Sequence, residues 1–151
     1  MQLKRKILTK KAIIGVVGLG YVGLPLILNA KAKGFITYGF DSDKKKILDL
    51  KKNLSPISDL KKKDLKKLNK KNLFDLSQIN RINNCDIIII CLPTPLTKNL
   101  KPDMSYLNNC CKKIIPFIRP QQLLIIESTV YPGATDEIFK SRIKKKFDIG
   151  K

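Results

Sequence analysis

The sequence predicts a doubly wound α/β fold, in which helices cover both faces of a parallel sheet. Short apolar runs rich in β-branched residues alternate with stretches of helical character, the order that builds such a sheet. One run contains four consecutive isoleucines, Ile87–Ile90, the continuous apolar pattern of a strand covered on both faces. A chain of 151 residues suits a single domain with a hydrophobic core. We therefore expect one domain over residues 1–151.

The first half of the chain predicts three strands, each with a helix after it. The first strand ends at a glycine and the second ends at Asp41. The first helix has Pro25 near its start, where proline is tolerated, and the Lys-rich third helix has leucines on one side. The basic N-terminus, 1–11, is assigned to no element. The expected strands are 12–17, 35–40 and 73–76, and the expected helices are 21–33, 43–52, 59–69 and 77–82.

The second half predicts two more buried strands and two helices, with an irregular loop between them. Three prolines in the loop 92–103 exclude regular structure there. A further strand is expected from Phe147 onward, where the chain stops, so we expect a domain truncated at its C-terminus. The expected strands are 86–91 and 123–127, and the expected helices are 105–118 and 134–146.

The charge of the chain raises the possibility of nucleic-acid binding. The formal net charge is +19, and most of the excess is lysine. The basic residues are spread along the chain and are not interleaved with aromatic residues, as a stacking platform for single strands requires. Nucleic-acid binding is therefore only an alternative. A lysine excess also attracts smaller anions such as dinucleotides and nucleotide-sugars.

Other classes of protein are disfavoured by what the chain contains. No apolar run approaches the roughly 20 residues of a membrane span, so we expect a cytoplasmic protein without a membrane partner. There is no histidine and no C-x-x-C pair, which excludes the usual mixed zinc sites and any Cys-His nucleophile. We expect no metal, and buried free thiols at the four cysteines: Cys85, Cys91, Cys110 and Cys111.

The strongest local signal is the glycine motif Gly18-Leu19-Gly20-Tyr21-Val22-Gly23, between a predicted strand and a predicted helix. In a G-x-G-x-x-G turn the first glycine permits the tight turn, the second lets the backbone approach a pyrophosphate, and the third lets the helix pack on the strand. The N–H groups and dipole of the helix start favour the negative charge. The motif predicts a Rossmann-like dinucleotide site, and a purely structural turn is the alternative.

Asp41 supports the dinucleotide interpretation. It ends the second predicted strand, 18 positions after Gly23, close to the spacing of the acid that binds the adenosine ribose hydroxyls. Hydrogen bonds to a charged group are worth about 1.5–3 kcal/mol each. The same carboxylate would repel a 2′-phosphate, so NAD is expected over NADP. A solvated strand-end acid or a helix cap is the alternative role.

Five ordered motifs resemble the UDP-glucose/GDP-mannose dehydrogenase family, over nearly the whole chain. The Glu-Ser-Thr-Val-Tyr-Pro-Gly form of the last motif is most similar to the branch acting on UDP-N-acetylglucosamine or UDP-N-acetylmannosamine. The resembling segments are residues 15–26, 39–43, 93–96, 102–103 and 127–133.

The resemblance implies a role for several residues. Tyr21 and Val22 would bind the pyrophosphate together with the glycines. Lys46 would contact the adenosine side, with a solvated helix lysine as the alternative, and Thr94 would line the pocket beside the nicotinamide half. Thr129 would lie near the nicotinamide and the reacting sugar carbon, as an auxiliary catalytic residue, or would instead cap a turn. Glu127 distinguishes the branch and is assigned no chemical role.

The resemblance also implies a reaction. Members of the family oxidise the primary alcohol of a sugar to a carboxylate, in two hydride transfers to NAD, with an active-site cysteine from outside the region matched here. None of the four cysteines corresponds to that residue. We therefore expect the NAD-binding part of a UDP-N-acetylhexosamine 6-dehydrogenase of surface-polysaccharide synthesis, inactive by itself towards its UDP-sugar. A non-catalytic NAD-binding module or decayed gene product is the alternative, and a homo-oligomer is possible only for the full-length enzyme.

Overall fold

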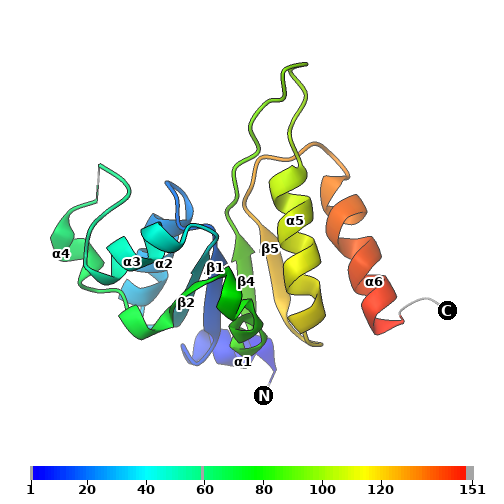
Figure 1. Ribbon diagram of the computed structural model, residues 1–151. Helices are drawn as coiled ribbons and strands as arrows, with labels where there is room; N and C mark the ends of the chain where they lie inside the picture. The colour runs from blue at the N-terminus through cyan, green and yellow to red at the C-terminus, as the bar shows by residue number, and fades with distance from the viewer. Residues whose placement is uncertain (1, 59, 149–151) are drawn as a thin grey trace.

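The chain folds around one parallel sheet, as seen in a computed structural model that describes residues 2–58 and 60–148. These residues form five strands in the order β3-β2-β1-β4-β5 (Figure 1). The central strand β1, Ile13–Val17, pairs with β2, Ile36–Asp41, and with β4, Ile87–Ile90. The edge strands are β3, Leu73–Asp75, and β5, Leu123–Ile126. The chain thus winds outward from β1 in both directions, which confirms the doubly wound α/β fold.

Helices cover both faces of the sheet. Alternate isoleucines of β4 point to opposite faces and enter two separate hydrophobic clusters, because side chains alternate along a strand. On one face lie α2, Gly23–Ala32, and α3, Lys44–Lys51. On the other lie α5, Ser105–Ile114, and a helix that begins as the π-helical η4, Asp136–Lys140, and continues as α6, Ser141–Phe147. The continuous apolar pattern of β4 therefore reflects burial on both faces.

Shorter helical elements complete the fold. They comprise α1 Leu3–Leu8, α4 Lys62–Leu65 and the 3-10 helices η1 Lys70–Asn72, η2 Leu76–Asn84 and η3 Ile115–Phe117. Within residues 2–58 and 60–148, no helix combines the length and the apolar character that crossing a membrane would require.

Two of the expected elements are wrong. The helix expected at 59–69 is only one turn, α4, and is followed by a turn and η1. Lysines four residues apart, such as Lys62 and Lys66, repel each other and disfavour a longer helix. Phe147 does not begin a strand, because it is the last residue of α6; the left-handed Asp148, with φ 53°, ends that helix. The rest of the expected strand lies outside the described residues.

The other expected strands and helices are confirmed, with ends that differ by a few residues. The sequence analysis missed α1, the helix within the basic N-terminus. Two of its apolar side chains, Leu3 and Ile7, pack against the α2 side of the core. Its Lys6 reaches the carboxylate of Asp86, which lies just before β4. The helix is therefore an integral part of the domain.

Asp86 holds three segments together at the amino-terminal edge of the sheet. Its buried carboxylate accepts hydrogen bonds from Lys6 Nζ at 2.5 Å, Ile13 N at 3.0 Å and Arg119 Nη2 at 3.0 Å. Burial acts to raise the pKa of Asp86, but these donors outweigh it and hold the pKa below its usual value. The cluster fixes α1 and the segment before β5 to the amino-terminal ends of β1 and β4, at the edge opposite the candidate site.

Candidate functional site

A cleft of about 440 Å³ opens at the carboxyl ends of the strands. All the site residues predicted from the sequence line this cleft except Gly23, which is buried at the start of α2. The lining consists of Gly18, Gly20, Tyr21, Val22, Asp41, Ser42, Lys46, Cys91, Leu92, Pro93, Thr94, Tyr106, Glu127, Ser128 and Thr129. Five separate segments of the sequence thus meet at one edge of the sheet, where ligands bind in open α/β folds.

The glycine loop is closely packed at both of its ends and open in the middle. Gly18 has φ +94°, and a Cβ there would lie 2.5 Å from the carbonyl oxygen of Cys91. A Cβ on Gly23 would lie 1.8 Å from the carbonyl oxygen of Gly18, so α2 packs directly on the turn. A Cβ on Gly20 would meet no atom within 4 Å. The backbone at Gly20 is therefore open to the cleft, and α2 begins beside it without a side-chain cap.

Asp41 connects the glycine loop to the end of β2. Its carboxylate is buried, and Oδ2 accepts hydrogen bonds from Leu19 N and from Lys46 Nζ, both at 2.8 Å. Oδ1 accepts from Asp43 N at 2.9 Å. A carboxylate has about four acceptor positions. Three of these positions are thus occupied, by the donors of Leu19, Asp43 and Lys46, and one remains for a ligand without displacement of Lys46.

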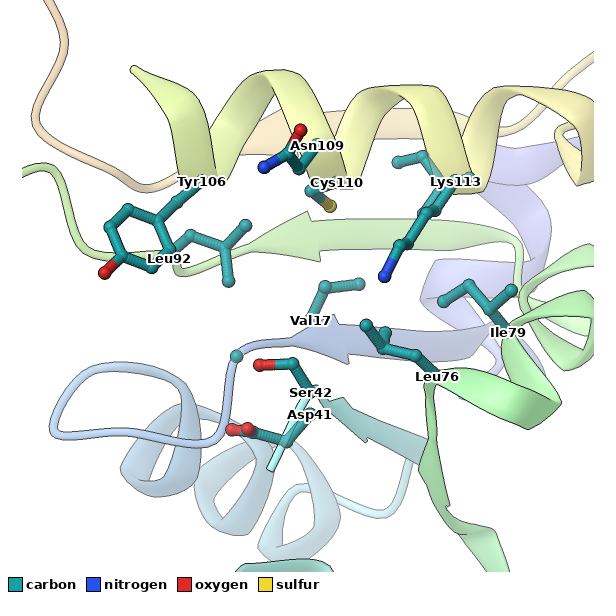
Figure 2. A pocket seen from close by; sticks show the side chains of 12 residues that line it. Val17, Asp41, Ser42, Leu76, Ile79, Leu92, Tyr106, Asn109, Cys110 and Lys113 are labelled. Atoms are coloured by element: carbon teal, nitrogen blue, oxygen red, sulfur yellow. The ribbon is translucent and has the colours of Figure 1, made fainter. Parts of the chain in front are cut away.

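A second pocket of about 210 Å³ adjoins the cleft beside Asp41 (Figure 2). It lies between α5 and η2, and the two cavities share Gly18, Asp41, Ser42, Leu92 and Tyr106. The sequence analysis missed its remaining lining residues: Val17, Leu76, Ile79, Asn109, Cys110, Lys113 and Ile114. This slot is mostly apolar, with a few polar groups from α5, a composition typical of sites for small molecules and cofactors.

One signal for the slot was present in the sequence. Tyr106, Asn109, Cys110 and Lys113 follow the three- and four-residue spacing of a single helix face. Figure 2 shows these side chains along α5, opposite apolar residues of the sheet and of η2. The spacing indicates that the four residues share a face, but only the fold shows that this face borders a pocket.

The loops after β4 and β5 are joined at the other end of the cleft. Leu92 N donates a hydrogen bond of 3.1 Å to Ser128 Oγ, which holds the loop with Thr94 next to the loop with Thr129. The β4–α5 loop projects beyond the sheet (Figure 1) and folds back on itself through a hydrogen bond of 2.7 Å from Asp103 N to the Pro95 carbonyl. The two threonines thus line the same cleft.

The four thiols of the domain have raised pKa values and are therefore poor nucleophiles at neutral pH. Burial raises the pKa of Cys91 to about 11, with a contribution from Glu127, and raises the pKa of Cys110 and of Cys85 to about 12. The pKa of Cys111 is also raised by burial. All four cysteines are free, and all are buried except the half-buried Cys110, close to the expected burial. Because the thiolate is the nucleophile, none of these cysteines is activated for attack.

Comparison with known proteins shows the family of this chain. Residues 12–150 match the family model described as the UDP-glucose/GDP-mannose dehydrogenase family, NAD binding domain. The UDP-N-acetyl-D-mannosamine dehydrogenase of Methanocaldococcus jannaschii is 36% identical, over 88% of this chain and 32% of its own length. The UDP-N-acetyl-D-glucosamine 6-dehydrogenase of Salmonella typhi is 35% identical, over 82% of this chain and 28% of its own length. The chain spans about a third of the length of the curated relatives that it matches.

Two solved structures of nucleotide-sugar dehydrogenases are also similar to this chain. The UDP-D-ManNAc dehydrogenase of Pyrococcus horikoshii superimposes with a TM-score of 0.80 at 26% identity, covering 92% of this chain and 33% of that one. The GDP-mannose dehydrogenase of Pseudomonas aeruginosa gives a TM-score of 0.77 at 27% identity, covering 88% of this chain and 32% of that one. Residues 12–150 match the family model, and the chain has the glycine loop and the Asp41 carboxylate described above. The chain therefore belongs to the UDP-glucose/GDP-mannose dehydrogenase family and contains its NAD-binding domain.

Proposed function

We propose that this chain is the cofactor-binding part of an NAD-dependent UDP-N-acetylhexosamine 6-dehydrogenase. The observation that carries the proposal is the cleft itself, which runs from Asp41 past the open backbone at Gly20 to Thr94 and Thr129. The named relatives, a UDP-N-acetylmannosamine and a UDP-N-acetylglucosamine dehydrogenase, support the choice of sugar class. Surface-polysaccharide synthesis is the process we propose the uronate product to serve.

The residues present fit NAD in one orientation. The adenine would occupy the apolar slot beside Asp41, and the ribose would hydrogen-bond to that carboxylate. The pyrophosphate would pass over Gly20, where no side chain stands in the way, at the start of α2. Tyr21 and Val22, which are 71% and 54% exposed, would border it on the solvent side.

The nicotinamide half would then extend towards the loops after β4 and β5, because the adenosine half takes the β2 side. There Thr94 and Thr129 line the cleft, and we propose that their hydroxyls orient the cofactor and the reacting sugar carbon. When bound, NAD supplies the hydride acceptor for oxidation of the sugar alcohol. The role of this chain is to bind and orient.

We propose that the nucleophilic cysteine of the reaction is not among the four present. Each has a pKa raised by burial, whereas a catalytic cysteine needs a stabilised thiolate. The chain by itself should accordingly bind NAD without oxidising UDP-sugars. Four free thiols also suit a reducing compartment, which favours the cytoplasm.

Calorimetric titration of the chain with NAD tests the proposal. Saturable binding that Asp41→Asn weakens about tenfold or more would support it, since hydrogen bonds to a charged acceptor are worth about 1.5–3 kcal/mol. The matched control is Asp75→Asn, which makes the same charge change at the end of the neighbouring strand but outside the cleft. A folded wild-type chain, verified by circular dichroism, that binds no NAD would contradict the proposal.

A further inference from the structure

The two carboxylates that line the cleft have different electrostatic surroundings. Asp41 is paired with Lys46, whose ammonium lies 2.8 Å from Oδ2. Glu127 lies at the end of β5, where its backbone N–H donates a hydrogen bond of 2.8 Å to the Ile90 carbonyl. Its side chain is exposed and lines the cleft. In the part of the chain that the structure describes, no ion pair or hydrogen bond engages the Glu127 carboxylate, so its negative charge is uncompensated.

The position of this charge relative to the cofactor follows from the proposed function, on which this inference rests. Asp41 and the glycine loop take the adenosine and pyrophosphate on the β2 and β1 side of the cleft. The remaining half of a dinucleotide must reach the β4 and β5 side, where Glu127 adjoins Ser128 and Thr129. The oxidised nicotinamide ring carries a positive charge, whereas the reduced ring is neutral. A fixed negative charge at this end therefore interacts differently with the two forms.

We propose that Glu127 recognises the charge of the oxidised nicotinamide and makes the domain bind NAD⁺ more tightly, relative to NADH, than a neutral residue would. Ser128 and Thr129 next to it are uncharged, and Lys46 lies beside Asp41 at the other end of the cleft. The Asp41–Lys46 pair has no net charge at the end that takes the uncharged adenosine, and the uncompensated anion lies at the end that takes the cationic ring. Glu127 is a specificity-determining residue in this proposal and takes no part in proton or hydride transfer.

The expected size of the effect is modest, because Glu127 is exposed and water weakens the attraction. We expect Glu127→Gln to change the ratio of the two dissociation constants by about three- to tenfold, through weaker binding of NAD⁺. For a two-electron couple, a tenfold change in this ratio corresponds to about 30 mV in the reduction potential of the bound cofactor. The wild-type residue would therefore make bound NAD⁺ slightly harder to reduce.

The test measures the dissociation constants of NAD⁺ by calorimetry and of NADH by fluorescence, for the wild type, Glu127→Gln and Glu127→Lys. The ratio of the NADH constant to the NAD⁺ constant should fall in the glutamine variant and fall further in the lysine variant. The matched control is Asp136→Asn, which removes a surface charge paired with Lys140 outside the cleft and should leave the ratio unchanged. The differences should shrink at high salt, because the charge is accessible to ions.

Two results would overturn the proposal while leaving the proposed function intact. If Glu127→Gln weakens both forms by the same factor, the residue contributes a contact that does not sense the charge of the ring. If neither constant changes, Glu127 does not face the nicotinamide. By contrast, a wild-type domain that binds neither nucleotide would contradict the proposed function itself, and this inference with it.

Discussion

The ammonium of Lys46 lies 2.8 Å from Oδ2 of Asp41, on the same carboxylate oxygen that accepts the Leu19 backbone N–H. The carboxylate thus closes the glycine loop onto β2 and at the same time carries its own counter-ion. Sequence reasoning treated Asp41 as a free acceptor for a ribose and Lys46 as a separate contact. Their pairing means that one cannot be changed without altering the charge that the other presents to a ligand.

Removal of Lys46 should increase the preference for NAD over NADP. In Lys46→Met the Asp41 carboxylate loses its counter-ion and repels a 2′-phosphate more strongly, and the cation that could meet this phosphate is gone. We expect the ratio of the NADP and NAD dissociation constants to rise about tenfold, which corresponds to about 1.4 kcal/mol. Calorimetry with both nucleotides measures it. Lys45→Met, at an exposed position of the same helix, should leave the ratio as in the wild type.

A methyl group at Gly20 should impair ligand binding without harming the fold. A Cβ there meets no atom within 4 Å, so the thermal stability of Gly20→Ala should remain close to that of the wild type. The added methyl would stand where the pyrophosphate must approach the backbone, and NAD affinity should fall at least tenfold. Wild-type affinity in this variant would show that the phosphates take another path.

A methyl group at Gly23, by contrast, should destabilise the fold. Its Cβ would lie 1.8 Å from the Gly18 carbonyl oxygen, a backbone atom that cannot move without displacing α2 from the turn. Overpacking of this kind costs about 1–3 kcal/mol and occasionally more. Gly23→Ala should therefore be clearly destabilised in a urea titration. A denaturation midpoint equal to that of Gly20→Ala would contradict the close packing.

The Asp86 cluster should make stability depend on pH. The pKa of this carboxyl is held below its usual value in the fold, so its contribution is complete above the unfolded pKa of about 4 and is lost as pH falls through the lower folded pKa. At neutral pH, Asp86→Asn should cost about 1–3 kcal/mol, because it removes the charged acceptor of Lys6 and Arg119, whose side chains are 30% and 35% exposed and can be partly rehydrated.

Chemical denaturation at a series of pH values between about 2 and 7, on both sides of the usual carboxyl pKa, measures this pH dependence of stability. The stability of the wild type should decline towards low pH more steeply than that of Asp86→Asn. The control is Asp64→Asn, which breaks a more exposed pair with Lys67 and should cost about 1 kcal/mol or less. Parallel pH profiles for the wild type and Asp86→Asn would contradict the assigned role.

The thiols should resist alkylation in the folded domain. With a pKa of about 11 for Cys91 and about 12 for Cys85 and Cys110, only a very small fraction of each is thiolate at pH 8. Iodoacetamide should therefore modify them slowly in buffer and rapidly in denaturant, as followed by mass spectrometry. Fast modification of one of them in the folded state would indicate an activated thiol.

The sequence by itself determined the features that depend on neighbours along the chain. The isoleucine run of β4, the glycine loop after β1 and the acid at the end of β2 were all predicted, because strand periodicity and turn chemistry are local. The sequence also predicted a parallel sheet, and such a sheet places the carboxyl ends of β1, β2, β4 and β5 at one edge, where the cleft lies.

Only the tertiary structure decided which distant side chains meet. The cluster of Lys6, Asp86 and Arg119 joins residues from three separate parts of the chain, and no local pattern predicts it. The slot between α5 and η2, and the charge left uncompensated at Glu127, likewise depend on how the helices pack on the sheet. The physical reason is that local patterns specify which face of an element is buried, whereas sheet order and helix packing determine what lies against it.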